Sequence, residues 1–264
     1  MTDSLPVPVD VKLMNFTASL LVAALVLSGI VAGLRWFARY PAFAIRQITV
    51  DGDTAHSSAT GLRASVEPRL SGTFFTMDLP AAESAFQSAP WVRRAQVRRV
   101  FPDQLHVTLQ EHVPVAHWGD DDSHMVNGFG EVFESGGDAG EGDLPTLVGP
   151  DGHVPELLAM YRQLEPLAEP LGARLNEVVL QARGNWRVQL DGGARVELGR
   201  GMPGELAARF NQFVATVKEV AARHERTVRD IEGADLRHAG GYALRLRGIS
   251  TVRATPASTP AARR

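Results

Sequence analysis

Residues 91–110 read WVRRAQVRRVFPDQLHVTLQ, and this stretch decides the fold of the region around it. Residues 101–104 (FPDQ) have turn character, and on both sides of them apolar and polar residues alternate. On the second side, Leu105, Val107 and Leu109 face one way and the polar residues face the other. The stretch therefore predicts a β-hairpin with one buried face.

The residues before the hairpin supply the layer that would cover this face. Residues 43–50 (FAIRQITV) are rich in strand formers. A short helix is expected from Ser57 or Ser58 through Leu70, and Asp78 is a suitable cap for a second helix that ends before Pro90. The order β-α-α-β-β thus occupies residues 43–112. We expect an antiparallel sheet with both helices on one face.

A second β-rich region follows at residues 113–249. Its expected strands and helices alternate with clusters of glycine and aspartate. Strand-like runs occupy 113–118, 123–127, 130–133, 175–182, 185–191, 194–198, 226–236 and 241–247, and amphipathic helices occupy 154–165 and 204–222. The fold class predicted for the chain is α+β, with an antiparallel sheet and flanking helices in this second domain. The Ser/Thr/Ala/Pro-rich residues 250–264 are predicted to be a disordered tail.

The chain also contains one candidate membrane span near its start. Residues 16–34 carry no charge, and at ~1.5 Å per residue they cover roughly the hydrocarbon thickness of a bilayer. Trp36 and Tyr40 follow where aromatic rings favour the interface. A cleaved signal peptide is the alternative, with residues 42–44 (AFA) as its cleavage site. The apolar run is longer than a typical signal core, so a retained anchor is favoured.

The charges beside this span do not decide its orientation. Lys12 lies on one side, and Arg35, Arg39 and Arg46 lie on the other. The positive-inside rule taken alone would place the large domain in the cytoplasm, but the rule is weak for long translocated domains.

Composition excludes several kinds of function. The formal net charge of −3 and the lack of a basic domain argue against nucleic-acid binding. The absence of cysteine excludes disulfides, thiolate zinc sites and cysteine nucleophiles.

No catalytic, cofactor or metal residue can be nominated from motifs. Residues 199–204 (GRGMPG) match the dinucleotide fingerprint, but the preceding run 194–198 alternates like a half-exposed strand, so a glycine turn is favoured. His106, His112, His117 and His124 lack a metal-ligand spacing. Neither G-x-S-x-G nor S-x-x-K occurs. We therefore expect no enzyme activity, no cofactor and no small-molecule substrate.

A series of short motifs recurs in one order along most of the chain. They are Val50-Asp51-Gly52, residues 90–102 (PWVRRAQVRRVFP), 111–118 (EHVPVAHW), 126–133 (VNGFGEVF), 144–147 (LPTL) with Gly149-Pro150, 198–200 (LGR) and Asp235-Leu236-Arg237. Together they resemble the FtsQ family, bitopic division proteins of Gram-negative bacteria.

This resemblance implies a location and an architecture. Residues 1–15 would be cytoplasmic and 16–34 would cross the inner membrane once. A POTRA domain (43–112) and an FtsQ-type β domain (113–249) would then lie in the periplasm at the division septum. The resemblance also implies a non-enzymatic scaffold that links early and late division proteins of the divisome and binds FtsB and FtsL.

The binding element implied is an edge strand near the C-terminus together with the neighbouring helix. Residues 241–247 would supply the edge, because no later strand is expected to cover it. The candidate partner-binding residues are Arg183, which we place on a nearby strand, and Arg237, Gly241, Tyr242 and Ala243. His238 stands where the family often has an aromatic residue. The alternatives are a half-buried core position for Tyr242 and solvated side chains for the two arginines.

Two rival functions remain. A periplasmic enzyme acting on the cell wall would need an indispensable carboxylate or histidine, and the sequence nominates none. A POTRA chaperone for outer-membrane or secreted proteins would normally show several POTRA repeats or a barrel, and one such pattern is visible.

Overall fold

The structure is a computed structural model that describes residues 9–57, 61–62, 66–120, 123–136, 143–238 and 240–249. The chain divides into two compact units, Met1–His112 and Val113–Arg264. The expected tail 250–264 lies outside the described residues. So does much of the helix expected before Leu70, of which Gly61, Leu62 and Val66 are seen as helical.

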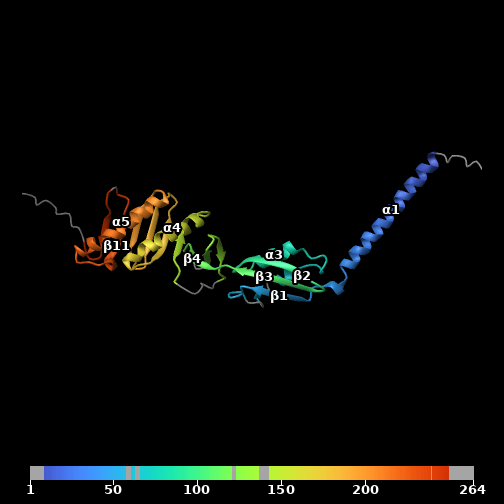
Figure 1. Ribbon diagram of the computed structural model, residues 1–264, viewed down its shortest axis with the longest axis horizontal. Coiled ribbons are helices and arrows are strands. Elements are labelled where there is room, and N and C mark those ends of the chain that lie inside the picture. Colours follow the sequence, from blue (N-terminus) through green and yellow to red (C-terminus); the bar gives the residue numbers. More distant parts are fainter. Residues whose placement is uncertain are drawn as a thin grey trace, which may run out of the picture. The chain divides into compact units, whose positions relative to one another are not determined.

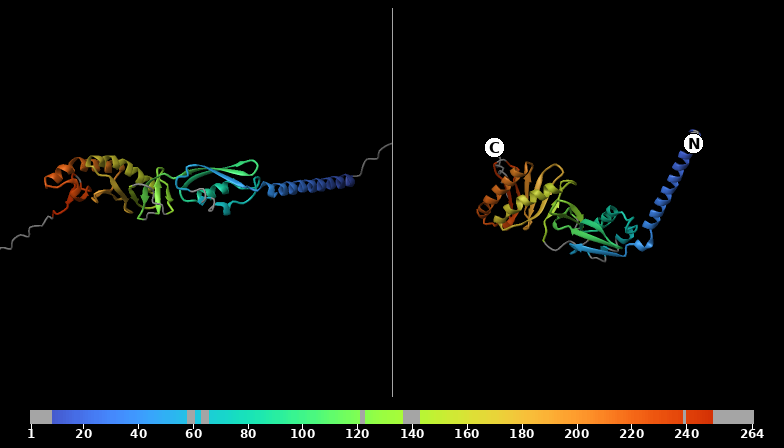
Figure 2. Two further views of the ribbon diagram at one scale, coloured as in Figure 1. Left: turned by 90° about the horizontal axis from the view of Figure 1, so that it is seen from below. Right: turned by 45° about the vertical axis from the view of Figure 1, so that its right-hand side comes forward.

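The first unit begins with helix α1, Val9–Ala38 (Figures 1 and 2). Helix α1 contains the charge-free run 16–34 and extends past it at both ends, and it is long and apolar enough to cross a membrane. Its 30 residues cover roughly 45 Å, more than the ~30 Å of a bilayer core. The charged residues Asp10, Lys12 and Arg35 lie in the first and last turns of the helix, where this extra length would place them outside the hydrocarbon of a bilayer that the helix crosses.

After α1 comes a small sheet covered by helix α3, Leu79–Gln87 (Figure 1). The remaining elements are η1 Pro41–Phe43, β1 Gln47–Gly52, η2 Glu67–Arg69, β2 Val92–Val100 and β3 Gln104–Glu111. The expected hairpin β2–β3 is present, and the Asp78 carboxylate caps α3 by accepting a hydrogen bond from the Ala81 backbone N–H at 3.2 Å. Strand β1 begins later than expected because the backbone first forms the 3-10 turn that starts at Pro41.

The prediction of a purely antiparallel sheet in this unit is wrong. The strand order is β1-β3-β2, and β1 pairs with β3 in parallel. The reason is the connection between β1 and β3: it contains α3 and β2, and so is long enough to bring the chain back in its original direction. One sheet face packs on α3 to form a core that includes Phe86, Leu105 and Val107.

The second unit is built on one nine-stranded sheet of order β12-β11-β10-β9-β8-β7-β4-β5-β6. Its strands are β4 Pro114–Trp118, β5 His124–Asn127, β6 Val132–Glu134, β7 Thr146–Val148, β8 Leu175–Leu180, β9 Trp186–Leu190, β10 Arg195–Gly199, β11 Ile231–Asp235 and β12 Ala243–Leu246. Its helices are α4 Val154–Ala168, η3 Glu169–Leu171, α5 Pro203–Ala222 and η4 Val228–Asp230.

The expected antiparallel sheet is again corrected to a mixed one. Three neighbouring pairs, β4–β7, β7–β8 and β10–β11, are parallel. Two of these follow from helices that act as crossovers: α4 connects β7 to β8, and α5 connects β10 to β11. Strand β7 has only three residues and was not expected from the sequence.

Helices α4 and α5 lie over the same face of this sheet (Figures 1 and 2). Beneath them the residues Val178, Val188, Val196 and Ala234 form one row in register across β8 to β11, and all four are buried. Helix α4 continues through Pro166, beyond the expected end at residue 165. Because Leu164 and Ala168 are both fully buried, their packing outweighs the hydrogen bond that Pro166 cannot donate.

Candidate partner-binding edge of the second unit

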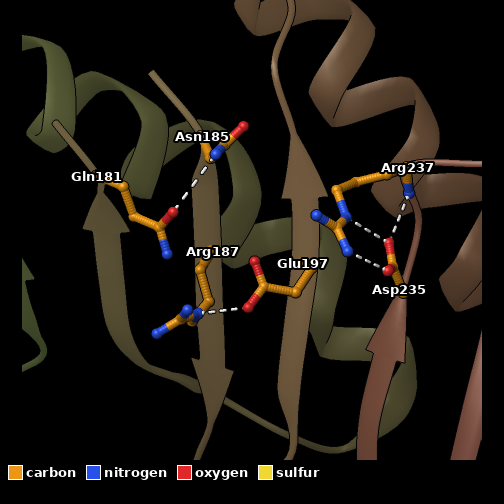
Figure 3. Close-up of polar contacts among 6 residues, drawn as sticks. All are labelled: Gln181, Asn185, Arg187, Glu197, Asp235 and Arg237. Atoms are coloured by element: carbon orange, nitrogen blue, oxygen red, sulfur yellow. Dashed lines mark hydrogen bonds and ion pairs between the residues drawn. The ribbon is translucent and has the colours of Figure 1, made fainter. Parts of the chain in front are cut away.

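The sheet face opposite α4 and α5 is polar. Arg187, Glu197, Asp235 and Ala243 form a row in register across β9, β10, β11 and β12. Within this row the Arg187 Nε donates to the Glu197 Oε1 at 2.6 Å, and both side chains are about one third exposed (Figure 3). This face is therefore a hydrated surface rather than part of the core.

Arg237 lies directly after β11 and is held by Asp235. Its Nε and Nη2 donate to the two carboxylate oxygens at 2.8 and 2.6 Å, and its backbone N–H donates to Oδ1 at 3.0 Å (Figure 3). These bonds lower the pKa of Asp235 to about 2. More than half of the Arg237 side chain remains exposed, at 55%. A guanidinium has more N–H donors than this pair uses, so Arg237 can still bind a second acceptor.

The glycine motif at 199–204 is explained by side chains of the same unit. Gly199 has a φ of +83°, and a Cβ there would lie 2.8 Å from the Arg237 Cγ. A Cβ at Gly201 would lie 2.7 Å from the Glu205 Oε2, which accepts a hydrogen bond from the Met202 backbone N–H at the start of α5. The first two glycines thus make room for Arg237 and for the cap of α5.

Three arginines come to the same end of the sheet. Arg183 lies in the turn between β8 and β9, not on a strand as expected, and is exposed. Arg200 follows β10 and donates from Nε to the Asn185 Oδ1 at 3.2 Å. Trp186 pairs with both Leu180 and Gly199, so the β8–β9 turn and the segment after β10 lie at the same end of the sheet. Strand β11 runs parallel to β10, so Arg237, which follows β11, lies at that end too. Arg200 was missed in the sequence, although its position directly after a strand was a usable signal.

Strand β12 lies at one end of the strand order. Among the residues that the structure describes, its only strand partner is β11. Ala243 and Arg245 are exposed and Leu246 is buried, so the strand has one core face and one open face. Gly241, just before it, is exposed.

Tyr242 is half-buried against α5. Its ring meets Phe213 edge-on with 5.2 Å between centroids, and its hydroxyl lies 2.9 Å from the Thr216 Oγ1. The side chain that was considered as a contact residue therefore also fastens the start of β12 to the helix. Beside the strand is a hollow lined by residues that include Val220, His224, Glu232, Leu244 and Ile249.

An apolar helix able to cross a membrane, followed by two α+β units, is the architecture of a bitopic membrane protein with extramembrane domains. Among the described residues, the sheet of the second unit ends in β12, which pairs with β11 alone. Comparison with known proteins agrees. Residues 43–112 match "POTRA domain, FtsQ-type", and residues 116–237 match "Cell division protein FtsQ/DivIB, C-terminal".

Relatives match over nearly the whole chain. The "Cell division protein FtsQ" of Burkholderia pseudomallei is 42% identical over 91% of this chain and 94% of its own length. The protein of the same name from Bordetella pertussis is 35% identical over 97% of this chain and 99% of its own length. That from Neisseria gonorrhoeae is 29% identical over 81% of this chain and 84% of its own length. The chain belongs to the FtsQ family of cell division proteins. Membership confirms the resemblance, supports a role in the divisome with protein partners there, and fits a single-pass inner-membrane protein.

Proposed function

We propose that this chain is a non-enzymatic scaffold of the division septum, which links early and late division proteins by binding FtsB and FtsL. In this proposal residues 1–15 are cytoplasmic, α1 crosses the inner membrane, and both units lie in the periplasm. Family membership supports the divisome role, and α1 supports the single span.

The observation that carries the binding proposal is the open edge of β12. An edge strand presents backbone N–H and C=O groups that a segment of a partner can pair with by strand addition. In β12 the exposed Ala243 and Arg245 lie on the open face, and the hollow bordered by Val220 and Ile249 lies beside the strand. An added strand could therefore place polar side chains on one face and an apolar side chain in the hollow.

The arginines at the end of the sheet indicate the charge of the partner. Arg237 is oriented by Asp235, and Arg183 and Arg200 come from neighbouring loops. Arginine is suited to bidentate pairing with a carboxylate. We propose that the partner segment carries an acidic residue that binds Arg237 and Arg183 next to the added strand.

A lysine on the edge strand tests strand addition. In Ala243→Lys, the long charged side chain would lose conformational freedom beside an added strand, and lysine is a residue by which natural edge strands resist pairing, so the variant should bind the FtsB–FtsL pair roughly 30-fold more weakly, equivalent to about 2 kcal/mol. Titration of the full-length chain in lipid nanodiscs with purified FtsB–FtsL measures this.

The matched control is Val132→Lys, which places the same charge on β6, the strand at the opposite end of the strand order. It should bind like the unmodified chain. Equal affinity of all three proteins, or an equal loss in both variants, would rule out β12 as the binding element.

A further inference from the structure

A cluster of phenylalanines lies where α1 meets the small sheet of the first unit. We name it the juxtamembrane aromatic cluster; its members are Phe37, Phe43, Phe74, Phe75 and Phe101. The rings follow one another in contact: centroids are 5.2 Å apart for Phe37–Phe43, 4.9 Å for Phe43–Phe75, 5.2 Å for Phe74–Phe75 and 5.8 Å for Phe74–Phe101. The residues come from α1, η1, the loop before α3 and the β2–β3 turn.

The outer rings of this cluster are exposed. The exposed fraction is 71% for Phe101, 53% for Phe37 and 47% for Phe75. Single exposed apolar residues are ordinary, but several large aromatic rings in one contiguous patch mark a surface that is covered by something apolar.

The cluster is tied to the end of the membrane-spanning helix. The Thr73 hydroxyl donates to the Ala38 carbonyl at 2.5 Å, and the Phe74 backbone N–H donates to the Phe43 carbonyl at 2.7 Å. Phe37 belongs to α1 itself. Because α1 is about as long as a bilayer with its headgroups, its last turn would lie among the headgroups, and the rings fastened to that turn would lie beside the acyl boundary.

Cations surround the cluster. Arg35 and Arg39 lie within one turn of Phe37, and Arg46 follows η1; all three are exposed. The Arg46 side chain is 70% exposed, and its Nε lies 4.0 Å from the Asp103 Oδ2, a distance at which an ion pair is weak. Phenylalanine at the acyl boundary with arginine at the phosphates is the combination that favours an interfacial position.

We propose that the first unit lies on the bilayer that α1 crosses, with Phe75 and Phe101 inserted at the acyl boundary and Arg39 and Arg46 on lipid phosphates. The unit would then be held against the membrane by a second contact in addition to the helix. This proposal goes beyond the partner-binding function and does not depend on which side of the membrane the unit occupies.

Fluorescence quenching by lipids tests the contact, and the chain lends itself to it because it contains no native cysteine. Phe101→Cys would carry a bimane label in the full-length protein, reconstituted into phosphatidylcholine–phosphatidylglycerol vesicles that contain lipids with a nitroxide just below the headgroup. Asp53→Cys is the matched site, at the opposite end of β1 and roughly 20 Å away along the strand. Ala23→Cys in α1 reports insertion of the helix.

We expect quenching at residue 101 to exceed that at residue 53 at least twofold and to approach that at residue 23. Equal quenching at residues 101 and 53 would overturn the proposal, and so would absence of quenching at residue 23, since the cluster would then have no bilayer beside it.

A second variant separates lipid contact from mere closeness to the helix. Phe75→Asp, added to the labelled Phe101→Cys protein, should reduce quenching to the level of residue 53, because a carboxylate resists entry at the acyl boundary. Phe129→Asp, at a site of the second unit that is 67% exposed, should leave it unchanged. Circular dichroism checks the fold of both variants, and unaltered quenching in folded Phe75→Asp would contradict insertion.

Discussion

Arg237 is oriented before any partner binds. Asp235 fixes its guanidinium through two side-chain hydrogen bonds, and the absence of a side chain at Gly199 leaves room for its methylene chain. A side chain that is already ordered loses less conformational entropy on binding than a freely rotating one. Arg237 is therefore better suited to a partner carboxylate than Arg183, for which no hydrogen bond is recorded in the described part of the chain.

Gly199→Ala should disturb this arrangement. The new Cβ would lie 2.8 Å from the Arg237 Cγ and would sit on a backbone with a φ of +83°. We expect the free energy of unfolding to fall by about 2–3 kcal/mol, of which roughly 1–2 kcal/mol is backbone strain. Displacement of Arg237 should also weaken FtsB–FtsL binding about tenfold. Urea unfolding and the nanodisc titration measure the two effects.

The control for Gly199→Ala is Gly184→Ala, in the β8–β9 turn. Gly184 has a similar φ of +78°, but a Cβ there would meet nothing within 4 Å. Gly184→Ala should therefore lower the free energy of unfolding by the backbone strain alone, and it should bind FtsB–FtsL as tightly as the unmodified chain. If both variants bind equally well, Arg237 does not contribute to partner binding in the orientation seen here.

At the scale of elements, Glu111 fastens the segment after β1 to the end of β3. Its side chain is only 4% exposed, and its Oε2 accepts a hydrogen bond from the His56 backbone N–H at 3.0 Å. The His56 ring in turn stacks on Trp91, with 3.9 Å between centroids and 9° between planes. Burial by itself raises the pKa of Glu111, but the hydrogen-bond donors of residues 56 and 57 close to its carboxylate outweigh burial and lower the pKa below its ordinary value.

Because the pKa of Glu111 is lowered by folding, its carboxylate stabilises the fold above the ordinary carboxyl pKa and ceases to do so as the pH falls through the lowered value. Glu111→Gln should therefore lower the free energy of unfolding by about 1–3 kcal/mol at pH 7, and the difference from the unmodified chain should shrink below about pH 4. Urea unfolding from pH 7 to pH 3 tests this. The exposed Glu67→Gln should behave like the unmodified protein at every pH, and a difference for Glu111→Gln that does not change with pH would contradict the role of its charge.

Strongly periodic elements could be predicted from the sequence. The β2–β3 hairpin and helix α5 have long amphipathic patterns, and both lie close to the expected residues. Strand β7 was not predicted, because its three residues are too few to show a period by themselves; the equally short β6 was found only as part of the strand-like run 130–133. Strand direction was also beyond local pattern: alternation is the same in parallel and antiparallel pairs, and the connections decide the direction, through α3 and β2 for β1–β3, α4 for β7–β8 and α5 for β10–β11.

Part of the candidate site could also be predicted from the sequence. That 241–247 would form an edge followed from its place as the last strand. The orientation of Tyr242 did not follow, because alternation separates two faces but the packing of Phe213 and Thr216 decides which of them is covered. Asp235 and Gly199 were quoted only as motif residues. The contact of Gly199 with Arg237 joins positions far apart in the sequence, whereas Asp235 is only two residues from Arg237, so that ion pair was within reach of local pattern.

At the scale of the whole molecule, the two units have separate hydrophobic cores. The core of the first unit contains Phe86, which packs on the three-stranded sheet. The core of the second unit contains Phe210 and Phe213 of α5, which pack on the nine-stranded sheet. Phe86 is 1% exposed and Phe210 is fully buried. Because cavity formation removes contacts only within the core where it occurs, each unit should respond to its own core substitution.

Phe210→Ala should therefore lower the stability of the second unit by about 3–5 kcal/mol and leave the first unit unchanged, and Phe86→Ala should do the reverse. Amide hydrogen exchange followed by mass spectrometry resolves this segment by segment in the full-length protein. Peptides from β9, β10 and α5 should lose protection in the first variant, and peptides from β2, β3 and α3 in the second. The two variants serve as controls for each other. Loss of protection in both units from either single substitution would mean that the two cores unfold as one cooperative structure, and that a partner bound at β12 would also stabilise the unit next to the membrane.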